Sequence, residues 1–534
     1  MKKNAIILAA GKSNRFAPFT YERPKGLFRV KNEILIERQI RQLNDAGVND
    51  IYVVVGYMKE KFFYLEKKYG VKLLINNTFS KYGNIYSLYV ARKYLSNTFI
   101  CCADQYFVNN PFIDNNDENI SYRATNYIKR KFREFSIDYS DADIITGCYI
   151  GGENRMAMVG HAYFNEKFSK SFRKMLENEI NDFGISNMFW EEFYAKHQKD
   201  LTLYMKKYEE GEILEFDSID DLRLFDSEFL INVDSKIVLN ICNTLKCKPN
   251  DIKNIKIIQA GLTNVSFKFT IENTQYVYRH PGGTAGNLIN RTAEIYAQNV
   301  AKKLKIDNSI IYMDPTGWKI SYYIDNTIPI SFKQNEIQLK MAIDYLKKIH
   351  NYSIQNANIK NFDCVAEGKK LMSIAATAKG NLFEEFADMI EKVEKIQRYA
   401  ENEAKENNMH KTLCHDDIYE PNFLLTNKNE LYLIDWEYAG INDPVCDLAN
   451  IITRDKYSDE EIDKIFKMYF GNDITKIQYR HAYAYLPINS FYWFSWGLYK
   501  GSVGEEDGFF FLPAYRNFYR FIEKALKMYE EHNQ

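Results

Sequence analysis

The sequence has few of the features that mark secreted, membrane-spanning or nucleic-acid-binding proteins. Its eight cysteines are scattered and form no CxxC pair, so we expect reduced thiols, with neither a disulfide nor a zinc site. The formal net charge of -1 provides no basic field for nucleic acid or anionic lipid. No apolar run approaches the roughly 18 residues of a membrane span. We therefore expect a soluble, cytoplasmic protein without membrane insertion and without a nucleic-acid partner.

The length of 534 residues exceeds what one hydrophobic core usually serves, so the chain should fold as at least two domains. A helical pattern near residue 230 gives way to β-rich runs from residue 255. We predict an amino-terminal domain over 1–229, a linker or first helix over 230–254, and a carboxy-terminal domain over 255–534. The sequence leaves the oligomeric state open.

The amino-terminal half alternates buried strands with an amphipathic helix. Residues 4–10 and 51–55 are apolar runs, and a helix-like segment at 34–43 separates them. This rhythm is typical of an open parallel sheet in an α/β protein. Further strands are expected at 71–75 and 98–103, an antiparallel addition at 143–150 and 156–164, and helix throughout 183–208.

The carboxy-terminal half begins with β-rich sequence and continues with helices. Strands are expected at 255–258, 265–271 and 276–279, a helix at about 290–304, and a hairpin at 309–324. The remainder has a helical pattern, interrupted by the turn-rich segment 412–438. This order of elements predicts a separate α+β domain.

The first strand leads into a glycine-containing turn that two cations follow. Ala9, Ala10 and Gly11 end the strand, and Arg15 and Lys25 come after it. Glycine lets the backbone approach a phosphate, free amides bind the phosphate oxygens, and the two side chains neutralise their charge. The pattern indicates a nucleoside triphosphate site, although an ordinary strand-to-helix turn is the alternative for the glycine by itself.

This stretch, with the segment Tyr82-Gly83-Asn84 further along, carries a family resemblance. The turn resembles that of the sugar-nucleotide-type nucleotidyltransferases, and the later segment resembles the branch that contains bacterial CTP:phosphocholine cytidylyltransferases. The resemblance covers roughly residues 1–225. It implies a Rossmann-like domain with a mixed, mostly parallel sheet. One departure is Ser13, which stands where the family motif has a second glycine.

Two carboxylates match the metal ligands of this family. Asp104 follows a predicted strand, and Asp217 lies in Glu-Phe-Asp-Ser. Magnesium prefers a few carboxylates together with phosphate oxygens, so this pair suits Mg²⁺. The resemblance implies a reaction without a protein nucleophile, in which the phosphate of the second substrate attacks the α-phosphorus and pyrophosphate leaves. A turn or helix cap is the alternative role for each aspartate.

Trp190 and Tyr194 lie on one expected helix, at positions i and i+4. Their rings are candidates for an aromatic wall around a quaternary ammonium group. The same spacing also describes two side chains that pack into the core, and the sequence leaves both roles open.

A second motif runs from His415 to Asn422 in the pattern HxDxxxxN, and Asp435 follows it at the end of a predicted strand. Phosphoryl transfer needs a carboxylate beside the attacking hydroxyl and oxygen ligands for magnesium, and this pattern supplies both. The segment resembles the choline and ethanolamine kinases, within the aminoglycoside-phosphotransferase-like kinases, over about residues 255–525. The resemblance implies a bilobal protein-kinase-like fold.

The resemblance also implies roles for individual residues. Asp417 takes the place of the catalytic base, and Asn422 and Asp435 those of the magnesium ligands. Three parts of the domain would bind the nucleotide. They are a loop with Gly261, Thr263 and Asn264, the strand residue Arg279 with its helix partner Glu294, and the hinge between the lobes with Tyr323. A surface ion pair is the alternative for Arg279 and Glu294.

Choline carries a cation without a hydrogen-bond donor on its nitrogen, so its pocket should combine aromatic faces with a carboxylate. Five residues fit that description and are candidates for binding the substrate, although aromatic residues at helical spacing also pack in cores. They are Glu437, Tyr438, Tyr492, Trp493 and Trp496.

The two halves together predict a bifunctional enzyme with Mg²⁺ as cofactor and choline, ATP, CTP and phosphocholine as its small-molecule substrates. One alternative is a sugar-phosphate nucleotidyltransferase fused to a kinase for another amino alcohol or sugar. Another is that one domain is an inactive ligand sensor, which the complete sets of charged residues disfavour. The sequence does not decide whether the kinase substrate is choline or ethanolamine, or whether the transferase uses CTP or UTP.

Overall fold

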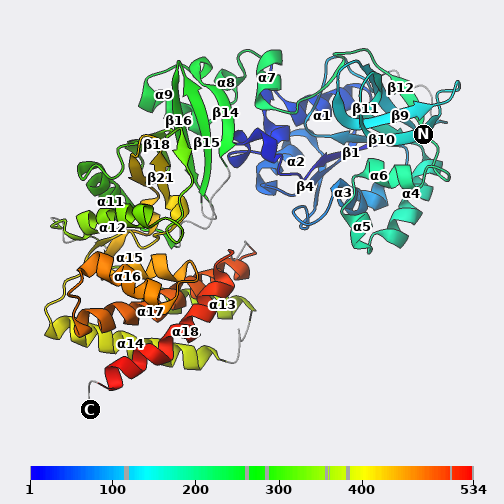
Figure 1. Cartoon of the computed structure of the whole chain (residues 1–534). Coiled ribbons are helices and arrows are strands. Elements are labelled where there is room, and N and C mark those ends of the chain that lie inside the picture. Colours follow the sequence, from blue (N-terminus) through cyan, green and yellow to red (C-terminus); the bar gives the residue numbers. More distant parts are fainter. Residues whose placement is uncertain are drawn as a thin grey trace. The chain divides into compact units, whose positions relative to one another are not determined.

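The computed structural model describes residues 2–113, 119–258, 264–282, 288–354, 359, 361–379, 385–504 and 508–531. The chain divides into two units, Met1–Ile255 and Lys256–Gln534 (Figure 1). Each unit has its own sheet and its own helices, which confirms the mixed α/β class. The predicted borders at residues 229 and 254 stay predictions.

The first unit is built on a mixed sheet with the strand order β10-β9-β11-β6-β1-β4-β5. The neighbouring strands β6, β1, β4 and β5 run parallel, and β11 joins them antiparallel to β6. The strands of the unit are β1 Asn4–Ala9, β2 Arg29–Val30, β3 Glu33–Ile34, β4 Asp50–Val55, β5 Lys72–Ile75, β6 Thr98–Cys102, β7 Gln105–Phe107, β8 Tyr122–Ile128, β9 Phe132–Tyr139, β10 Ile145–Gly152, β11 Arg155–Phe164, β12 Tyr204–Lys207 and β13 Ile213–Glu215.

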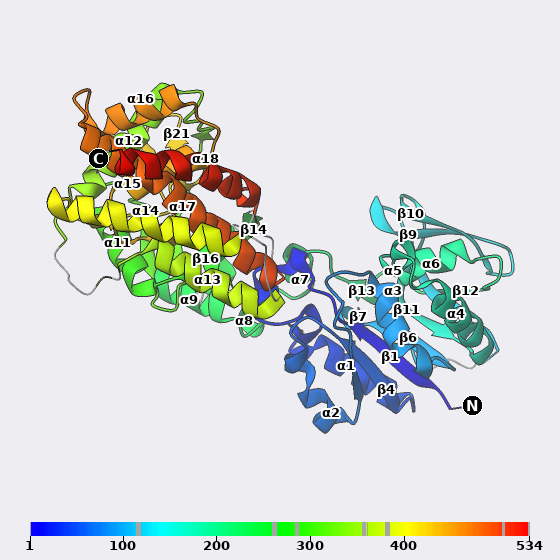
Figure 2. The same ribbon diagram turned by 90° about the horizontal axis from the view of Figure 1, so that it is seen from below.

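Successive side chains of β1 enter opposite cores, because side chains alternate along a strand. Ile6 and Leu8 pack in one apolar cluster, whereas Ala5 and Ile7 pack in the other. Helices therefore cover both faces: α1 and α2 lie on one side of β1, and α4 and α6 on the other (Figure 2). The helices are α1 Leu35–Asp45, α2 Tyr64–Tyr69, α3 Asn84–Ala91, α4 Glu166–Glu179, α5 Phe183–Ser186, α6 Trp190–Lys196, α7 Ile219–Phe225, α8 Phe229–Asn232 and α9 Lys236–Leu245.

The expectation of helix throughout 183–208 is wrong at its end. Residues Tyr204–Lys207 form β12, which pairs in parallel with β8. Hydrogen bonds to a strand about eighty residues earlier in the chain outweigh the local helical pattern, which is the usual way in which tertiary context overrides propensity.

Residues that follow the sheet of the first unit pack against the segment 19–22, which comes after the turn at Gly11. Phe229 packs edge-on against Phe19, with ring centroids 5.6 Å apart. The carboxylate of Glu22 accepts hydrogen bonds from the backbone N–H of Lys236 and of Ile237, at the start of α9. These contacts fix α8 and α9 to the amino-terminal unit.

The second unit begins with an antiparallel sheet of order β14-β15-β16-β18-β17 and continues with helices. Its strands are β14 Lys253–Ile258, β15 Asn264–Ile271, β16 Thr274–Pro281, β17 Ile310–Met313, β18 Lys319–Tyr322, β19 Thr327–Ile328, β20 Thr412–Cys414, β21 Phe423–Thr426, β22 Leu431–Leu433 and β23 Gly440–Asn442. Its helices are α11 Arg291–Lys303, α12 Glu336–His350, α13 Cys364–Lys379, α14 Phe386–Glu406, α15 Val445–Thr453, α16 Asp459–Phe470, α17 Lys476–Ser502 and α18 Phe511–Glu530.

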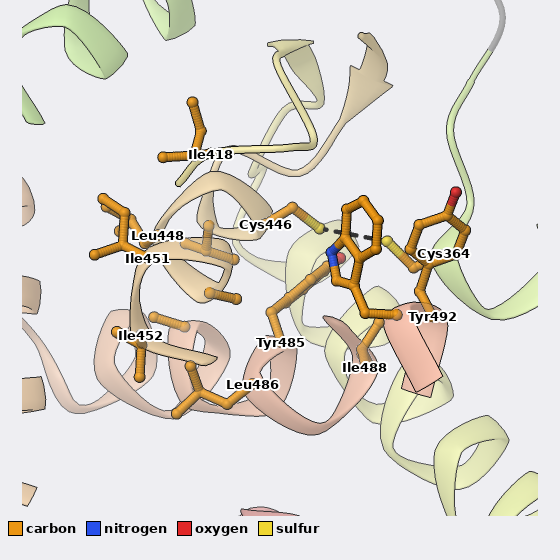
Figure 3. Packing of buried hydrophobic residues seen from close by; sticks show 14 of the residues in the cluster. Cys364, Ile418, Cys446, Leu448, Ile451, Ile452, Tyr485, Leu486, Ile488 and Tyr492 are labelled. Atoms are coloured by element: carbon orange, nitrogen blue, oxygen red, sulfur yellow. Dashed lines mark hydrogen bonds between the residues drawn. The ribbon is translucent and has the colours of Figure 1, made fainter. Parts of the chain in front are cut away.

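The helical part has one large apolar core centred on α17. Leu448 and Ile452 of α15 pack near Leu486 of α17, while Tyr485 and Tyr492 of α17 lie close to the sulfur atoms of Cys364 and Cys446 (Figure 3). α17 is buried on all sides from His481 to Gly497, which agrees with the absence of a continuous polar face along this stretch. Among the described helices, none combines the length and the apolar character that a membrane crossing requires.

Candidate functional sites

A cavity of about 410 Å³ opens at the carboxyl end of β1 in the first unit. This is the edge of a parallel sheet where ligands usually bind. Ala9, Ala10, Gly11, Lys25 and Asp104, all of them predicted site residues, line it. The remaining lining residues are Leu8, Ser13, Pro24, Gly26, Asn76, Phe79, Tyr82, Gly83, Asn84, Ser87, Cys102, Ala103, Phe189 and Glu215.

Lys25 and Asp104 form the charged centre of this cavity. Nζ of Lys25 lies 2.9 Å from Oδ2 of Asp104 and donates to the carbonyl oxygen of Phe216 at 2.6 Å. The neighbouring Gly26 allows this approach, because a Cβ atom there would lie 2.7 Å from the Cβ of Ala103. Burial acts to raise the pKa of Asp104, but the ammonium of Lys25 outweighs it and lowers that pKa.

A short antiparallel pair, β7 with β13, brings the second carboxylate segment to Asp104. Glu215 lies opposite Gln105 in the register, and Phe216 and Asp217 follow directly. Asp217 accepts a hydrogen bond of 2.7 Å from Arg15, and both side chains are largely exposed. The structure thus pairs Arg15 with Asp217 and Lys25 with Asp104, but only the second pair lines the cavity.

Glu215 is a site residue that our sequence argument did not select. Glu215 lines the cavity beside Asp104, where desolvation by the surrounding chain and the charge of Asp104 raise the pKa of Glu215 to about 7. Neighbouring carboxylates of this kind offer the hard oxygen donors that Mg²⁺ takes. The signal was its position two residues before Asp217, at the end of a strand.

Trp190 and Tyr194 do not lie in the cavity. Their side chains are 1% and 0% exposed and belong to the apolar core under the sheet, so the structure supports the packing role. Three other aromatic residues line the cavity instead, namely Phe79, Tyr82 and Phe189.

Ser13 has the left-handed backbone conformation, with φ 49° and ψ 48°. Glycine adopts this conformation without steric cost, whereas other residues rarely do. The backbone of the turn after β1 therefore keeps the shape that a second glycine would favour, although a serine occupies the position.

A second cavity, of about 440 Å³, lies in the carboxy-terminal unit between the antiparallel sheet and the segment that follows β20. Asn264, Arg279, Tyr323, Asn422 and Asp435, all predicted site residues, line it. The other lining residues are Ile258, Ser266, Val277, Asp307, Ser309, Ile310, Lys319, Ser321, Tyr322, Ile324, Thr327, Tyr419, Pro421, Leu424 and Ile434. Gly261 and Thr263, also predicted for the nucleotide, lie outside the described residues.

Arg279 makes three hydrogen bonds at the wall of this cavity. Its guanidinium donates to Asp435 at 3.0 Å, to Glu294 at 2.5 Å and to the carbonyl oxygen of Gly317 at 3.1 Å. Arg279 and Glu294 are both buried, so the pair is not the surface ion pair of the alternative reading. The guanidinium connects the sheet, helix α11 and the proposed metal ligand.

Lys319 is a second cation in the cavity that the sequence argument missed. It lies opposite Arg279 in the β16–β18 register, and its ammonium is 3.9 Å from Asp435. Burial acts to raise the pKa of Asp435, but Lys319 and Arg279 outweigh it and lower that pKa. A lysine on the inward face of a hairpin strand was the available signal.

The segment after β20 brings Asp417 and Asn422 together. Nδ2 of Asn422 donates to the backbone oxygen of Asp417 at 2.8 Å and to its Oδ2 at 3.2 Å. His415 lies behind them, with Nε2 3.0 Å from the carbonyl oxygen of Ile434. Asp447 accepts hydrogen bonds from the backbone N–H of His415 and of Asp416, and so holds the loop in place.

The four aromatic residues predicted to bind the substrate converge. They are buried within the helical core, as the alternative role predicted, and line neither of the two cavities. The ring of Trp493 lies 5.5 Å from that of Tyr438 and 5.1 Å from that of Tyr492, and Nε1 of Trp496 donates to the hydroxyl of Tyr438 at 2.9 Å. The fifth candidate, Glu437, is directed elsewhere, because its carboxylate accepts a 2.6 Å hydrogen bond from Asn264, the first residue of β15.

Comparison with known proteins gives two family matches, one in each unit. The MobA-like NTP transferase domain matches residues 5–123, and the choline/ethanolamine kinase family matches residues 255–486. Both matches agree with the predicted fusion.

Three relatives illustrate the two likenesses. The choline-phosphate cytidylyltransferase of Streptococcus pneumoniae is 32% identical over 219 residues, which are 41% of this chain and 95% of the relative. The 2-aminoethylphosphonate cytidylyltransferase of Lancefieldella rimae is 35% identical and matches over 43% of this chain and 94% of its own length. The structure of choline kinase LicA from Streptococcus pneumoniae is 22% identical, with a TM-score of 0.44, over 55% of this chain and 97% of its own.

The two cytidylyltransferases are matched over almost their whole length in the first half of the chain, and the choline/ethanolamine kinase family model matches the second half. The chain therefore belongs to the MobA-like NTP transferases, among their cytidylyltransferases, and joins this domain to a second one of the choline/ethanolamine kinase family.

Proposed function

We propose that the carboxy-terminal unit phosphorylates choline with ATP and that the amino-terminal unit joins the phosphocholine to CTP, giving CDP-choline and pyrophosphate. The observation that carries this proposal is that each unit has its own charged cavity, and that the carboxy-terminal unit also has a group of converging aromatic residues, Tyr438, Tyr492, Trp493 and Trp496. Each cavity has its own cations for a nucleotide, and the aromatic group suits a quaternary ammonium.

In the kinase unit, Asp417 would accept the proton of the choline hydroxyl as its oxygen attacks the γ-phosphorus of ATP. Asn422 orients that carboxylate through its 3.2 Å hydrogen bond. Arg279 and Lys319 would bind phosphate oxygens, and the Tyr323 segment would meet the adenine. Asn422 and Asp435 would hold Mg²⁺, which supplies charge neutralisation at the phosphates when bound.

In the transferase unit, a phosphate oxygen of phosphocholine would displace pyrophosphate from the α-phosphorus of CTP, so no protein nucleophile is needed. Lys25 and Arg15 would neutralise the triphosphate, and the amides after Ala9 and Ala10 would bind its oxygens. Asp104, Asp217 and Glu215 would hold Mg²⁺, which supplies Lewis-acid chemistry at the phosphates when bound.

A second acceptor for the transferase is 2-aminoethylphosphonate, which the relative from Lancefieldella rimae names. That acceptor already carries its phosphorus and needs no kinase. The fused kinase domain therefore favours an acceptor that is made by phosphorylation.

The test is direct. The purified chain is incubated with choline, ATP, CTP and MgCl₂, and the products are identified by mass spectrometry, with ethanolamine, 2-aminoethylphosphonate and UTP as competing substrates. Phosphocholine and CDP-choline as the main products support the proposal. Preferred use of another alcohol, acceptor or nucleotide replaces the substrate named here.

A further inference from the structure

The aromatic group beside Asp417 already holds a cation, and that cation belongs to the protein. The guanidinium of Arg454 lies 4.0 Å from the ring centroid of Trp493, 4.4 Å from that of Phe510 and 5.1 Å from that of Tyr419. Its NH2 group donates to Oδ1 of Asp417 at 2.9 Å. Arg454 ends α15 and was not selected from the sequence.

This is the chemistry with which a protein binds an organic cation: ring faces around the charge and one carboxylate beside it. A guanidinium and a trimethylammonium group are both monovalent, weakly hydrated cations that bind well to ring faces. Two such groups do not fit side by side here, because the side chains of Arg454 and Asp417 are only 9% and 12% exposed. Occupation by one excludes the other.

The position relative to the reacting atoms also matches a substrate. Asp417 is the expected acceptor of the hydroxyl proton, and one of its oxygens receives Asn422 while the other receives Arg454. Tyr419 faces the guanidinium and also lines the nucleotide cavity. In choline two carbon atoms separate the cation from the hydroxyl, so a cation in this place has its hydroxyl near the nucleotide.

The guanidinium of Arg454 can move away from the rings and from Asp417. Its Nε atom is buried and has no hydrogen-bond partner within the described part of the chain. Arg454 is the capping residue that follows the last turn of α15, and the next residue, Asp455, has a side chain that is 45% exposed. Because Arg454 lies beyond the last residue of α15, displacement of its side chain toward the exposed Asp455 does not require the helix to move.

We propose that Arg454 occupies the site for the cationic group of the substrate in the ligand-free kinase unit, and that the substrate binds by displacing it. Arg454 then sets the affinity and the charge selectivity of this site. The inference rests on the proposed function, in that the alcohol to be phosphorylated carries a cation.

The experiment measures binding of choline and of methylguanidinium by calorimetry, without nucleotide, to the full chain and to Arg454→Ala. Removal of the internal competitor should tighten choline binding by about tenfold or more, the worth of one good cation–π site. Methylguanidinium should bind Arg454→Ala, compete there with choline, and bind the wild type much more weakly. Arg454→Gln, which keeps a hydrogen-bond donor but no charge, should also tighten choline binding and serves if the alanine variant does not fold.

The matched control is Arg480→Ala. Arg480 is a second shielded arginine of the same unit, which pairs with Glu403 and stacks on the ring of Tyr529 at 4.8 Å. Its loss should leave the choline affinity unchanged.

The outcomes separate the inference from the proposed function. Choline that binds the folded Arg454 variants no more tightly than the wild type, together with no binding of methylguanidinium, overturns the role of Arg454. Binding of methylguanidinium to Arg454→Ala without binding of choline to any protein supports the cation site and overturns choline as the substrate.

Discussion

Lys25 and Asp104 form an ion pair inside the amino-terminal cavity, with Nζ 2.9 Å from Oδ2. Replacement of Lys25 by methionine leaves a shielded carboxylate without its cation and removes a positive charge from the triphosphate site. We expect Lys25→Met to lower the rate of pyrophosphate release at least about a hundredfold, as for the loss of other electrostatic groups in active sites. The measurement is the initial rate with CTP and phosphocholine.

The control for this variant is Lys12→Met, because Lys12 lies exposed on the same turn and its ammonium is 6.0 Å from the ring centroid of Phe79. It should keep nearly the full rate. Equal losses in the two variants would mean that general positive charge, and not the pair with Asp104, matters.

Arg279 should not be replaceable by lysine. Its guanidinium binds Asp435, Glu294 and the carbonyl oxygen of Gly317 at once, and an ammonium group lacks the planar fork for these contacts. A hydrogen bond to a charged group contributes about 1.5–3 kcal/mol, so Arg279→Lys should raise the Michaelis constant for ATP about tenfold or more. Steady-state kinase assays measure this, and pyrophosphate release by the same protein should be unchanged. An unchanged Michaelis constant for ATP would contradict the role of these hydrogen bonds in ATP binding.

His161 should make the first unit less stable in acid. It is fully buried, and burial, with the nearby cations of Lys206 and Arg123, lowers its pKa well below 6.5. Above about pH 6.5 neither the folded nor the unfolded chain protonates this residue. Below it the unfolded chain gains a proton that the folded chain does not, so the unfolding free energy should fall by about 1.4 kcal/mol per pH unit.

The matching variant is His161→Phe, since the rings of Phe99, Phe107 and Phe112 surround the site and accept another ring. Urea titrations of both proteins at pH 7.5 and 5.5 give the comparison. The wild type should lose more stability than the variant, and equal losses would assign the acid sensitivity to other groups.

Replacement of Trp493 should raise the Michaelis constant for choline and leave that for ATP unchanged. Its ring faces the cation position at 4.0 Å, where Arg454 now lies. A desolvated cation–π contact contributes about 2 kcal/mol, so Trp493→Ala should raise the Michaelis constant for choline by about tenfold or more. Trp493→Leu should restore only part of the affinity, because leucine packs without a ring quadrupole.

The uncharged analogue 3,3-dimethylbutanol provides the check on this interpretation. The wild type should use it poorly, since it lacks the cation that the rings attract. If the analogue competes as well as choline, or if Trp493→Ala changes only the Michaelis constant for ATP, the ring of Trp493 packs in the core and does not bind the cation.

The fold was predictable where hydrophobic patterns are local and continuous. The buried run 4–10 and the motif from His415 to Asn422 both carry their own signal. The strand at Tyr204–Lys207 was missed because only its pairing with β8 specifies it, and this pairing joins residues far apart in the chain.

The residues that line the two cavities show the same division. Lys25, Asp104 and Arg279 could be selected as candidates because they lie in or beside recognisable motifs. Arg454 ends a helix in a polar segment that has no such motif, and only the tertiary packing brings it to Asp417. Trp190 and Tyr194 show the converse, since an aromatic pair on one helix face does not reveal whether that face meets a ligand or the core.

The central claim is that the chain carries two enzymes with independent sites, and a pair of single variants tests it most directly. Asp104→Ala and Asp417→Ala are each incubated with choline, ATP, CTP and MgCl₂, and phosphocholine and CDP-choline are quantified by mass spectrometry. Asp104→Ala should still make phosphocholine but no CDP-choline. Asp417→Ala should make neither from choline, yet should form CDP-choline at the wild-type rate when phosphocholine is added. Loss of both activities in each folded variant, even with added phosphocholine, would contradict the account.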